Sequence, residues 1–320
     1  MSRRVIIAVL LLCVLLAGCN RSRKRVIAVV PKGTAHLFWV SVHAGAMAAG
    51  EDLGVEVLWN GTNQETEYAR QIQIVDSMIA RRVDGLALAA ADRNALVQAV
   101  DRVVAAGIPV TIFDSGLDGQ NYTSFVATNN VEAGQMAART LAGLLGGRGK
   151  VGMVLHATGS YSTMERERGF DETMAREFPG IEIVARQYGL SDRAKAYAAA
   201  ENILAAHPGL NGMFASTEPS AAGISLALKG HNLAGKVKFV AFDSSETMIE
   251  DLKAGVIHAT VVQDPFRIGY TAVQTLVDKL NGKTPPRRID LSGQVVSLEN
   301  INRTEIQALL HPNINKYLKK

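Results

Sequence analysis

Side chains that suit recognition of a polyhydroxylated molecule recur at the C-terminal ends of predicted β-strands. The polar residues at these positions are Lys32, Asp114, Ser115, Asp243 and Gln263. Each sugar hydroxyl both donates and accepts hydrogen bonds, so carboxylate, amide and ammonium groups can all pair with it. This pattern indicates a site for a sugar-like ligand.

Two adjacent aromatic residues, Phe38 and Trp39, lie in the first of these segments, just after His36. The apolar C–H face of a sugar ring can stack on such rings. Each residue also has a purely local interpretation. Asp114 and Asp243 could cap the helices that follow them, and the two aromatics could form the first core turn of a helix. Because such residues occur at several strand ends, a ligand site is favoured over these local roles.

Secondary-structure elements must position these residues. Along the chain, short β-rich runs alternate with longer amphipathic runs. Such alternation predicts βαβ units and a parallel sheet. Strands are expected at 26–30, 55–59, 85–89, 109–113, 125–127, 151–155, 181–185, 212–215, 237–242 and 259–263. Helices are expected at 39–53, 65–82, 93–106, 131–145, 163–177, 193–206, 220–229, 245–254 and 268–280.

About ten strands are too many for one compact sheet with short connections, so the pattern predicts an α/β fold with two doubly wound parallel-sheet lobes. No long Pro/Gly/Ser linker separates them, which indicates that several strand crossings form the hinge. Ligands of open α/β sheets bind at the carboxyl ends of the strands. With two facing sheets those ends converge on one cleft.

Several segments resemble the periplasmic sugar-binding proteins of the ribose-binding type, over nearly all of residues 26–310. The segments are KGTAHLFWVSV, IPVTIFDSG, ERERGF, MFASTEPSAAG, FVAFDSSE and ATVVQDPFRIG. The resemblance implies the type I periplasmic binding protein fold. It also implies one lobe of residues 26–128 plus 264–291 and a second lobe of residues 129–263 plus 292–320.

The resemblance further implies a set of ligand-binding residues from both lobes. They are Lys32, His36, Phe38, Trp39, Asp114, Ser115, Arg166, Ser191, Thr217, Asp243 and Gln263. Three of them depart from the ribose type, which has Arg, an aromatic residue and Asn where this chain has Ser115, Ser191 and Thr217. These departures predict a ligand other than ribose. The Pro31-Lys32 pair is also similar to the binding proteins for the furanosyl autoinducer.

The first 25 residues indicate export and anchoring. Arg3 and Arg4 precede an apolar run over 5–17, which is too short to span a membrane but typical of a secretory signal. Leu16-Ala17-Gly18-Cys19 resembles a bacterial lipobox, which implies a signal peptide over 1–18, a lipid on Cys19 and a basic tether over 19–25. The alternatives are an ordinary signal peptide with a chance cysteine, or an uncleaved anchor.

Charge and motifs argue against other classes of protein. The formal charge is +4, from 34 basic and 30 acidic residues, but residues 1–25 hold six bases and no acid. The remainder has 28 bases against 30 acids, without the basic excess of a nucleic-acid binder. Repressors of the lac type share the two-lobe fold, but here a signal and tether stand where their DNA-binding module would be. GLLGGRGK lacks the spacing of a phosphate loop.

The function expected is that of a substrate-binding lipoprotein of an ABC importer. It would capture a sugar or similar polyol in the cleft and deliver it to a membrane permease. We expect a monomer at the periplasmic or extracellular face, with no cofactor, no metal, no nucleic acid and no enzyme activity. The alternative is a ligand-sensing accessory of a membrane chemoreceptor or kinase, which would share the cleft and the anchor.

Overall fold

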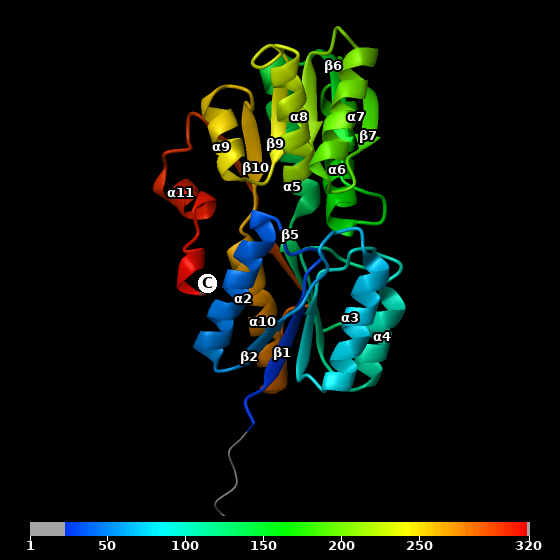
Figure 1. The fold of residues 1–320 in the computed structure, drawn as a ribbon, viewed down its shortest axis with the longest axis vertical. Coiled ribbons are helices and arrows are strands. Elements are labelled where there is room, and N and C mark those ends of the chain that lie inside the picture. The colour runs from blue at the N-terminus through cyan, green and yellow to red at the C-terminus, as the bar shows by residue number, and fades with distance from the viewer. Residues whose placement is uncertain (1–22, 319–320) are drawn as a thin grey trace, which may run out of the picture.

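The computed structural model describes residues 23–318. The predicted signal peptide, the lipobox and Cys19 lie outside this range. Two layered α/β units are stacked end to end, and we call the unit that contains the N-terminal strand lobe one and the other lobe two (Figure 1). In the described residues, no helix has both the length and the apolar character needed to cross a membrane.

Lobe one is built on a six-stranded parallel sheet with the order β11-β5-β4-β3-β1-β2. Its strands are β1 (Val26–Val30), β2 (Glu56–Trp59), β3 (Gly85–Leu88), β4 (Val110–Phe113), β5 (Ser124–Thr128) and β11 (Arg288–Leu291). Strands β3 and β4 are buried along their whole length. Continuous apolar runs of this kind are typical of parallel strands covered on both faces.

Lobe two repeats the arrangement with a sheet of order β12-β10-β9-β8-β6-β7. Its strands are β6 (Gly149–Leu155), β7 (Ile181–Tyr188), β8 (Gly212–Ala215), β9 (Lys238–Phe242), β10 (Ala259–Val262) and β12 (Gln294–Ser297). The edge strand β12 runs antiparallel to β10, whereas the other pairs are parallel.

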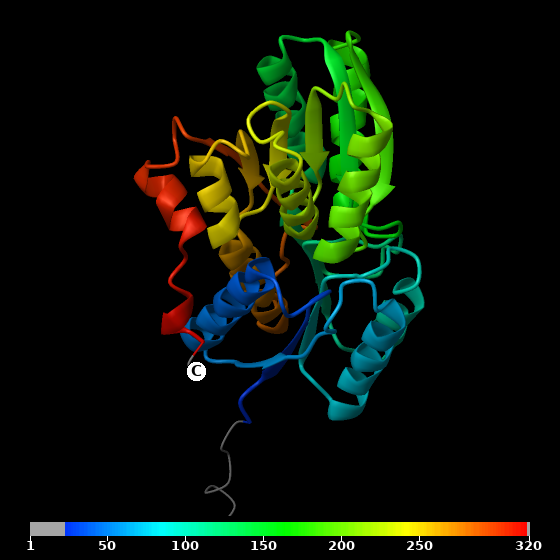
Figure 2. The same cartoon turned by 45° about the horizontal axis from the view of Figure 1, so that its top comes forward.

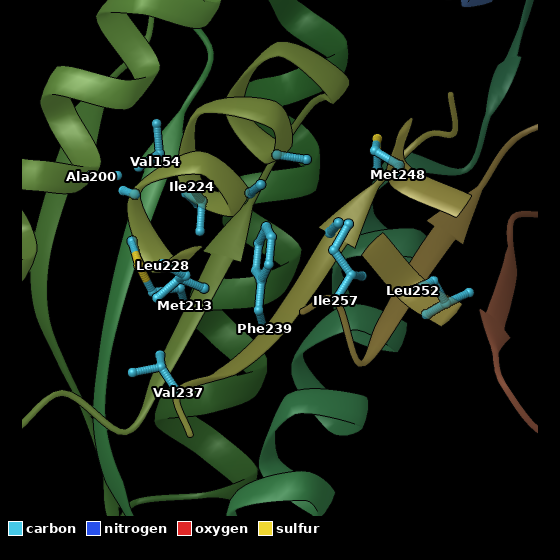
Figure 3. Close-up of a cluster of buried hydrophobic side chains, with 14 of the residues drawn as sticks. Val154, Ala200, Met213, Ile224, Leu228, Val237, Phe239, Met248, Leu252 and Ile257 are labelled. Carbon is cyan, nitrogen blue, oxygen red and sulfur yellow. The ribbon is translucent and has the colours of Figure 1, made fainter. Parts of the chain in front are cut away.

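Helices cover both faces of each sheet and enclose separate apolar cores. In lobe one they are α2 (Leu37–Leu53), α3 (Tyr68–Arg81), α4 (Val97–Ala105) and α10 (Pro265–Leu280). In lobe two they are α5 (Asn130–Leu145), α6 (Tyr161–Glu177), α7 (Arg193–Ala206), α8 (Glu218–Gly230), α9 (Glu246–Lys253) and α11 (Thr304–Leu310). Figure 3 shows part of the lobe-two core, where Phe239 and Ile224 are fully buried among aliphatic side chains.

Glycines allow the helix that carries a key arginine to pack closely on its neighbour. A Cβ added at Gly134 of α5 would collide with the carbonyl oxygen of Arg166 in α6, and one at Gly169 of α6 would collide with the carbonyl oxygen of Val131. The backbones of α5 and α6 therefore approach each other too closely for larger side chains. This contact fixes the position of α6 against the sheet.

The chain passes between the lobes at three places close to the cleft: from β5 to α5, from β10 to α10, and from β11 to β12. The C-terminal segment then returns toward lobe one (Figure 2). Ile306 and Leu310 of α11 belong to the lobe-two core. The short 3-10 helix η1 (Ile314–Lys316) follows, and the Tyr317 ring lies 5.6 Å from that of Phe266 in α10.

The predicted α/β fold with two sheets is confirmed, and each expected strand and helix is present within a few residues of its predicted bounds. Both sheets are dominated by parallel pairs, as predicted, and the antiparallel edge strand β12 is an addition that the sequence pattern did not indicate. Sequence reasoning also missed β11, β12, α11 and η1. The strand β11 is half exposed, so its sequence does not show the continuous apolar run of a buried strand.

Candidate functional site

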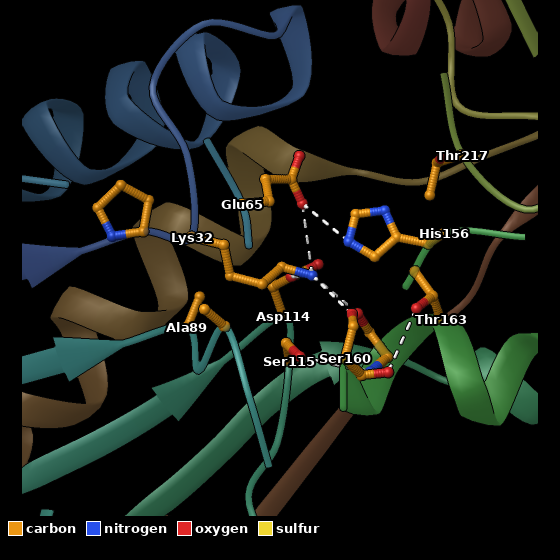
Figure 4. Close-up of polar contacts among 12 residues, drawn as sticks. Lys32, Glu65, Ala89, Asp114, Ser115, His156, Ser160, Thr163 and Thr217 are labelled. Carbon is orange, nitrogen blue, oxygen red and sulfur yellow. Dashed lines mark hydrogen bonds and ion pairs between the residues drawn. The ribbon is translucent and has the colours of Figure 1, made fainter. Parts of the chain in front are cut away.

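A cleft lies between the two lobes, at the C-terminal ends of the strands of both sheets. It is lined by Lys32, His36, Phe38, Trp39, Glu65, Asp114, Ser162, Thr163, Arg166, Thr217, Glu218, Pro219, Asp243 and Gln263. Most of the residues predicted from the sequence thus come together, although they extend along the chain from position 32 to position 263. Figure 4 shows the polar side of this region, where side chains of the two lobes face one another.

Lys32 occupies the boundary between the lobes and is only 2% exposed. Its Nζ lies 3.6 Å from Asp114 Oδ2 and 3.6 Å from Glu65 Oε2, both in lobe one. The same ammonium group donates hydrogen bonds to the hydroxyls of Ser160 (3.2 Å) and Ser162 (3.3 Å) in lobe two. Lys32 therefore contributes to contact between the lobes as well as to the cleft wall.

Glu65 is a cleft residue that sequence reasoning missed, because it was taken as the first residue of a helix. It lies instead in the loop before α3 and accepts a hydrogen bond from Trp39 Nε1 at 3.0 Å. Burial alone would raise the pKa of Glu65. The surrounding positive charges, Lys32 foremost, outweigh burial and lower this pKa to about 2.

His156 faces Glu65 from lobe two, with 3.7 Å between its Nε2 and Glu65 Oε2. Burial lowers the pKa of His156 to about 4, so the ring is neutral near pH 7. Within residues 23–318, neither ring nitrogen of His156 has a hydrogen-bond partner. The cation that keeps Glu65 ionised near pH 7 is therefore Lys32.

Asp114 follows β4 in a left-handed backbone conformation, with φ of 54°. Burial raises the pKa of its carboxyl to about 6, against the opposing effects of Lys32 and Arg166. The alternative interpretation of the two aspartates as helix caps does not hold for Asp243, because Ser245 caps α9 by accepting a hydrogen bond from the N–H of Met248.

Arg166 is fully enclosed in lobe two, with 2% exposure. Its Nη2 donates to Asn130 Oδ1 at 2.9 Å, and Nη1 donates to the carbonyl oxygen of Ser216. The guanidinium carbon lies 3.4 Å from the centre of the Phe242 ring. Burial lowers the pKa of Arg166, with Asp243 and Asp114 opposing that effect. The side chain is held rigidly, with its planar group at the cleft wall.

Asp243 and Gln263 form a linked pair beside the crossing from β10 to α10. Gln263 Nε2 donates to Asp243 Oδ1 at 2.7 Å, and Thr128 Oγ1 donates to Gln263 Oε1 at 2.7 Å. Thr128 belongs to lobe one, so the amide of Gln263 connects the lobes. Burial raises the pKa of Asp243, while Arg166 and the hydrogen bond from Gln263 act in the opposite direction.

Glu218 begins α8 and lines the cleft next to Thr217. Its Oε1 accepts a hydrogen bond from Arg193 at 2.6 Å. Its Oε2 is buried, has no hydrogen-bond partner among the described residues, and lies 3.6 Å from Nδ1 of His36 in lobe one. An acceptor in this state is suited to a donor on a ligand. Glu218 was not among the residues predicted to bind, although it directly follows Thr217, which was.

Phe38 and Trp39 serve both the cleft and the core, so the two interpretations of these aromatics are compatible. Their ring centres are 4.9 Å apart with planes nearly perpendicular, and Trp39 also meets Phe113 edge to face. Trp39 is part of the lobe-one core and Phe38 packs against it. Both line the cleft. The rings are therefore held in place by the core that they complete.

Two predicted residues, Ser115 and Ser191, are not among those lining the cleft. Ser115 is completely buried, and its Oγ accepts a hydrogen bond at 3.4 Å from the backbone N–H of Ser162 in lobe two. Ser191 lies in the turn after β7 with φ of 56°, and its hydroxyl is buried. The turn directs the Ser191 side chain into the protein.

Comparison with known proteins gives the family. Residues 27–284 match the family described as periplasmic binding protein domain. The chain belongs to the periplasmic binding protein family. A relative from this family is the D-ribose/D-allose-binding protein of Pseudomonas aeruginosa, 31% identical over 82% of this chain and 85% of the relative. Another is the ribose import binding protein of Bacillus subtilis, which is 30% identical over 79% of this chain and 80% of the relative.

Solved structures of periplasmic binding proteins have the same fold. A carbohydrate transporter solute binding protein from Agrobacterium radiobacter, in complex with D-arabinose, superposes with a TM-score of 0.88 and 30% identity. The match covers 91% of this chain and all of that one. An ABC transporter solute binding protein from Agrobacterium vitis with bound D-fucose has a TM-score of 0.86 and 33% sequence identity. That match covers 89% of this chain and 100% of the other. The names of these relatives describe proteins that bind ribose, allose, arabinose or fucose.

Proposed function

We propose that this protein captures a sugar or a similar small polyol in the cleft between its lobes and delivers it to the permease of an ABC importer. The observation that carries the proposal is the composition of the cleft. Hydrogen-bond donors and acceptors meet there beside the ring of Trp39. Lobe one supplies Asp114, lobe two supplies Arg166 and Asp243, and Gln263 lies at the crossing between the lobes. Each type of group pairs with hydroxyls, and the ring suits a C–H face.

We further propose that binding proceeds by closure of two moving bodies, residues 26–128 plus 264–291 and residues 129–263 plus 292–320. Residues of the cleft come from both bodies, so a ligand contacts both only when they are closed. A ligand with higher affinity for the closed arrangement stabilises it. The ligand is expected to differ from ribose because Ser115 and Ser191 do not supply the arginine and the aromatic ring of the ribose type.

A thermal-shift screen of the purified chain tests the proposal. The panel is D-ribose, D-allose, D-arabinose and D-fucose, extended by deoxy sugars, amino sugars and linear polyols. A ligand that binds only the folded protein raises the melting temperature in a concentration-dependent way. Calorimetry on each hit then gives the affinity. If no compound of the panel shifts the transition or releases heat on binding, the assignment to sugar capture is wrong.

Anchoring is a separate part of the proposal. We propose that residues 1–18 are removed as a signal peptide, that Cys19 carries a lipid, and that residues 19–25 tether a monomeric protein to the outer side of the bacterial cell membrane. Metabolic labelling with a radioactive fatty acid checks this. Label on the wild-type protein that disappears in Cys19→Ala supports the anchor, and equal labelling of the two proteins contradicts it.

A further inference from the structure

Tyr161 begins α6 in lobe two, but its ring packs on the core of lobe one. The ring centre lies 5.9 Å from that of Phe125 in β5, with the planes nearly perpendicular. The guanidinium carbon of Arg93, also in lobe one, stands 4.9 Å from the same ring centre. Edge-to-face rings and a cation over a ring are both attractive arrangements.

The fit around this ring is close. A Cβ added at Gly116 of lobe one would lie 3.0 Å from Cδ1 of Tyr161, so the absence of a side chain there makes room for the ring. Arg93 is held for its contact by Asp118, whose Oδ1 accepts hydrogen bonds from Nε at 2.8 Å and from Nη2 at 2.6 Å. Arg93, Gly116 and Phe125 of lobe one therefore form a preformed contact surface for Tyr161 of lobe two, and we call this surface the seat.

Backbone contacts extend the same interface on either side of Tyr161. The N–H of Arg93 donates to the carbonyl oxygen of Gly159 at 2.8 Å. The N–H of Ser162 donates to Ser115 Oγ at 3.4 Å. Gly159 has φ of +89°, and a Cβ there would collide with a carboxylate oxygen of Asp92. The approach of the loop before α6 to lobe one thus depends on a glycine.

The Tyr161 ring and the residues that hold it are distinct from the cleft wall, because none of Tyr161, Arg93 and Phe125 lines the cleft. We infer that Tyr161 and its seat on lobe one form a latch that stabilises the closed arrangement of the lobes without touching the ligand. The latch raises affinity by increasing the fraction of protein that is already competent to hold the ligand. The effect on affinity depends on the proposed function, whereas the effect on closure does not.

The test compares Tyr161→Ala, Tyr161→Phe and Arg93→Gln with the wild type, and uses Tyr188→Ala, at an exposed tyrosine of lobe two, as the matched control. Small-angle X-ray scattering of the ligand-free full chain measures the balance of open and closed forms. From the strength of aromatic and cation–π contacts, Tyr161→Ala is expected to lower the closed-to-open ratio roughly 5- to 20-fold. Tyr161→Phe retains the ring contacts but loses the hydroxyl that interacts with Arg288 of lobe one, so its ratio should fall less than that of Tyr161→Ala.

Calorimetry with the most stabilising sugar of the screen gives the second readout. Where the open form dominates, the dissociation constant of Tyr161→Ala should increase by the same factor as the ratio falls. Unchanged scattering in both Tyr161→Ala and Arg93→Gln overturns the latch, and if the alanine variant does not fold, Arg93→Gln alone decides. If no sugar binds to the wild type, the proposed function fails while scattering still tests the latch.

Discussion

Replacing Glu65 with glutamine removes the buried carboxylate that faces Lys32 while keeping the shape of the side chain. In the folded protein the pKa of Glu65 is about 2, below its ordinary value of 4.5. A carboxyl group with a lowered pKa stabilises the fold fully above its unfolded-state pKa. It loses that contribution as the pH falls toward the folded-state pKa.

The size of the effect follows from the difference between the two pKa values. At 1.36 kcal/mol for each pKa unit, ionised Glu65 contributes roughly 3 kcal/mol to the free energy of unfolding near pH 7. The same linkage leaves about 1.5 kcal/mol at pH 3, because the unfolded chain has by then taken up the proton. Glu65→Gln should therefore be markedly less stable at neutral pH and should approach the wild type in acid.

Urea unfolding of both proteins at several values between pH 7 and pH 3 measures this difference. Glu56→Gln is the matched control, since Glu56 is an exposed carboxylate of the same lobe. Its stability should follow that of the wild type at each pH. A stability deficit of Glu65→Gln that stays constant over the range would show that lost packing or lost hydrogen bonding, rather than ionisation, is responsible. A variant as stable as the wild type at pH 7 would refute the reasoning altogether.

Three further changes test the cleft and the packing of the helix that carries Arg166. Arg166→Ala should weaken sugar binding roughly 10- to 150-fold, the effect of losing hydrogen bonds from a charged group, whereas Arg168→Ala on the exposed side of α6 should bind normally in calorimetry. Because the pKa of Asp114 is raised to about 6, sugar affinity measured by titration should fall as the pH drops below about 6, and Asp114→Asn should lose this dependence. Gly134→Ala should destabilise the fold by roughly 1–3 kcal/mol by separating α5 from α6. Gly143→Ala in the same helix, where a Cβ meets nothing, should not; equal melting temperatures for the two variants would contradict the packing argument.

The strand ends were predictable because parallel strands are buried runs followed by polar residues, and the carboxyl ends of such strands gather at one edge. This rule found Asp114, Asp243 and Gln263 without any knowledge of their partners. It could not find Glu65, which lies several residues beyond the end of β2 and reaches the cleft through the path of a loop. A search of every loop after a strand would have included Glu65.

Adjacency in the sequence was a poor guide to which side chains face the ligand. Ser115 follows Asp114 directly, yet it turns toward the backbone of Ser162. Ser191 stands after Leu190, and both residues have left-handed backbone conformations that send the chain in a direction no propensity predicts. Such conformations are rare for residues other than glycine. In these turns, the orientation of a side chain depends on tertiary contacts.

The strand β11 has a consequence for the order in which the protein folds. It supplies an edge of the lobe-one sheet by pairing with β5, and Ser124 Oγ donates to the carbonyl oxygen of Pro286, 162 positions later in the chain. The helix α10, which covers the same sheet, also comes late in the sequence. Bringing such distant segments together costs loop-closure entropy and slows folding. The lobe that begins at the N-terminus is therefore completed only when almost the whole chain has been synthesised.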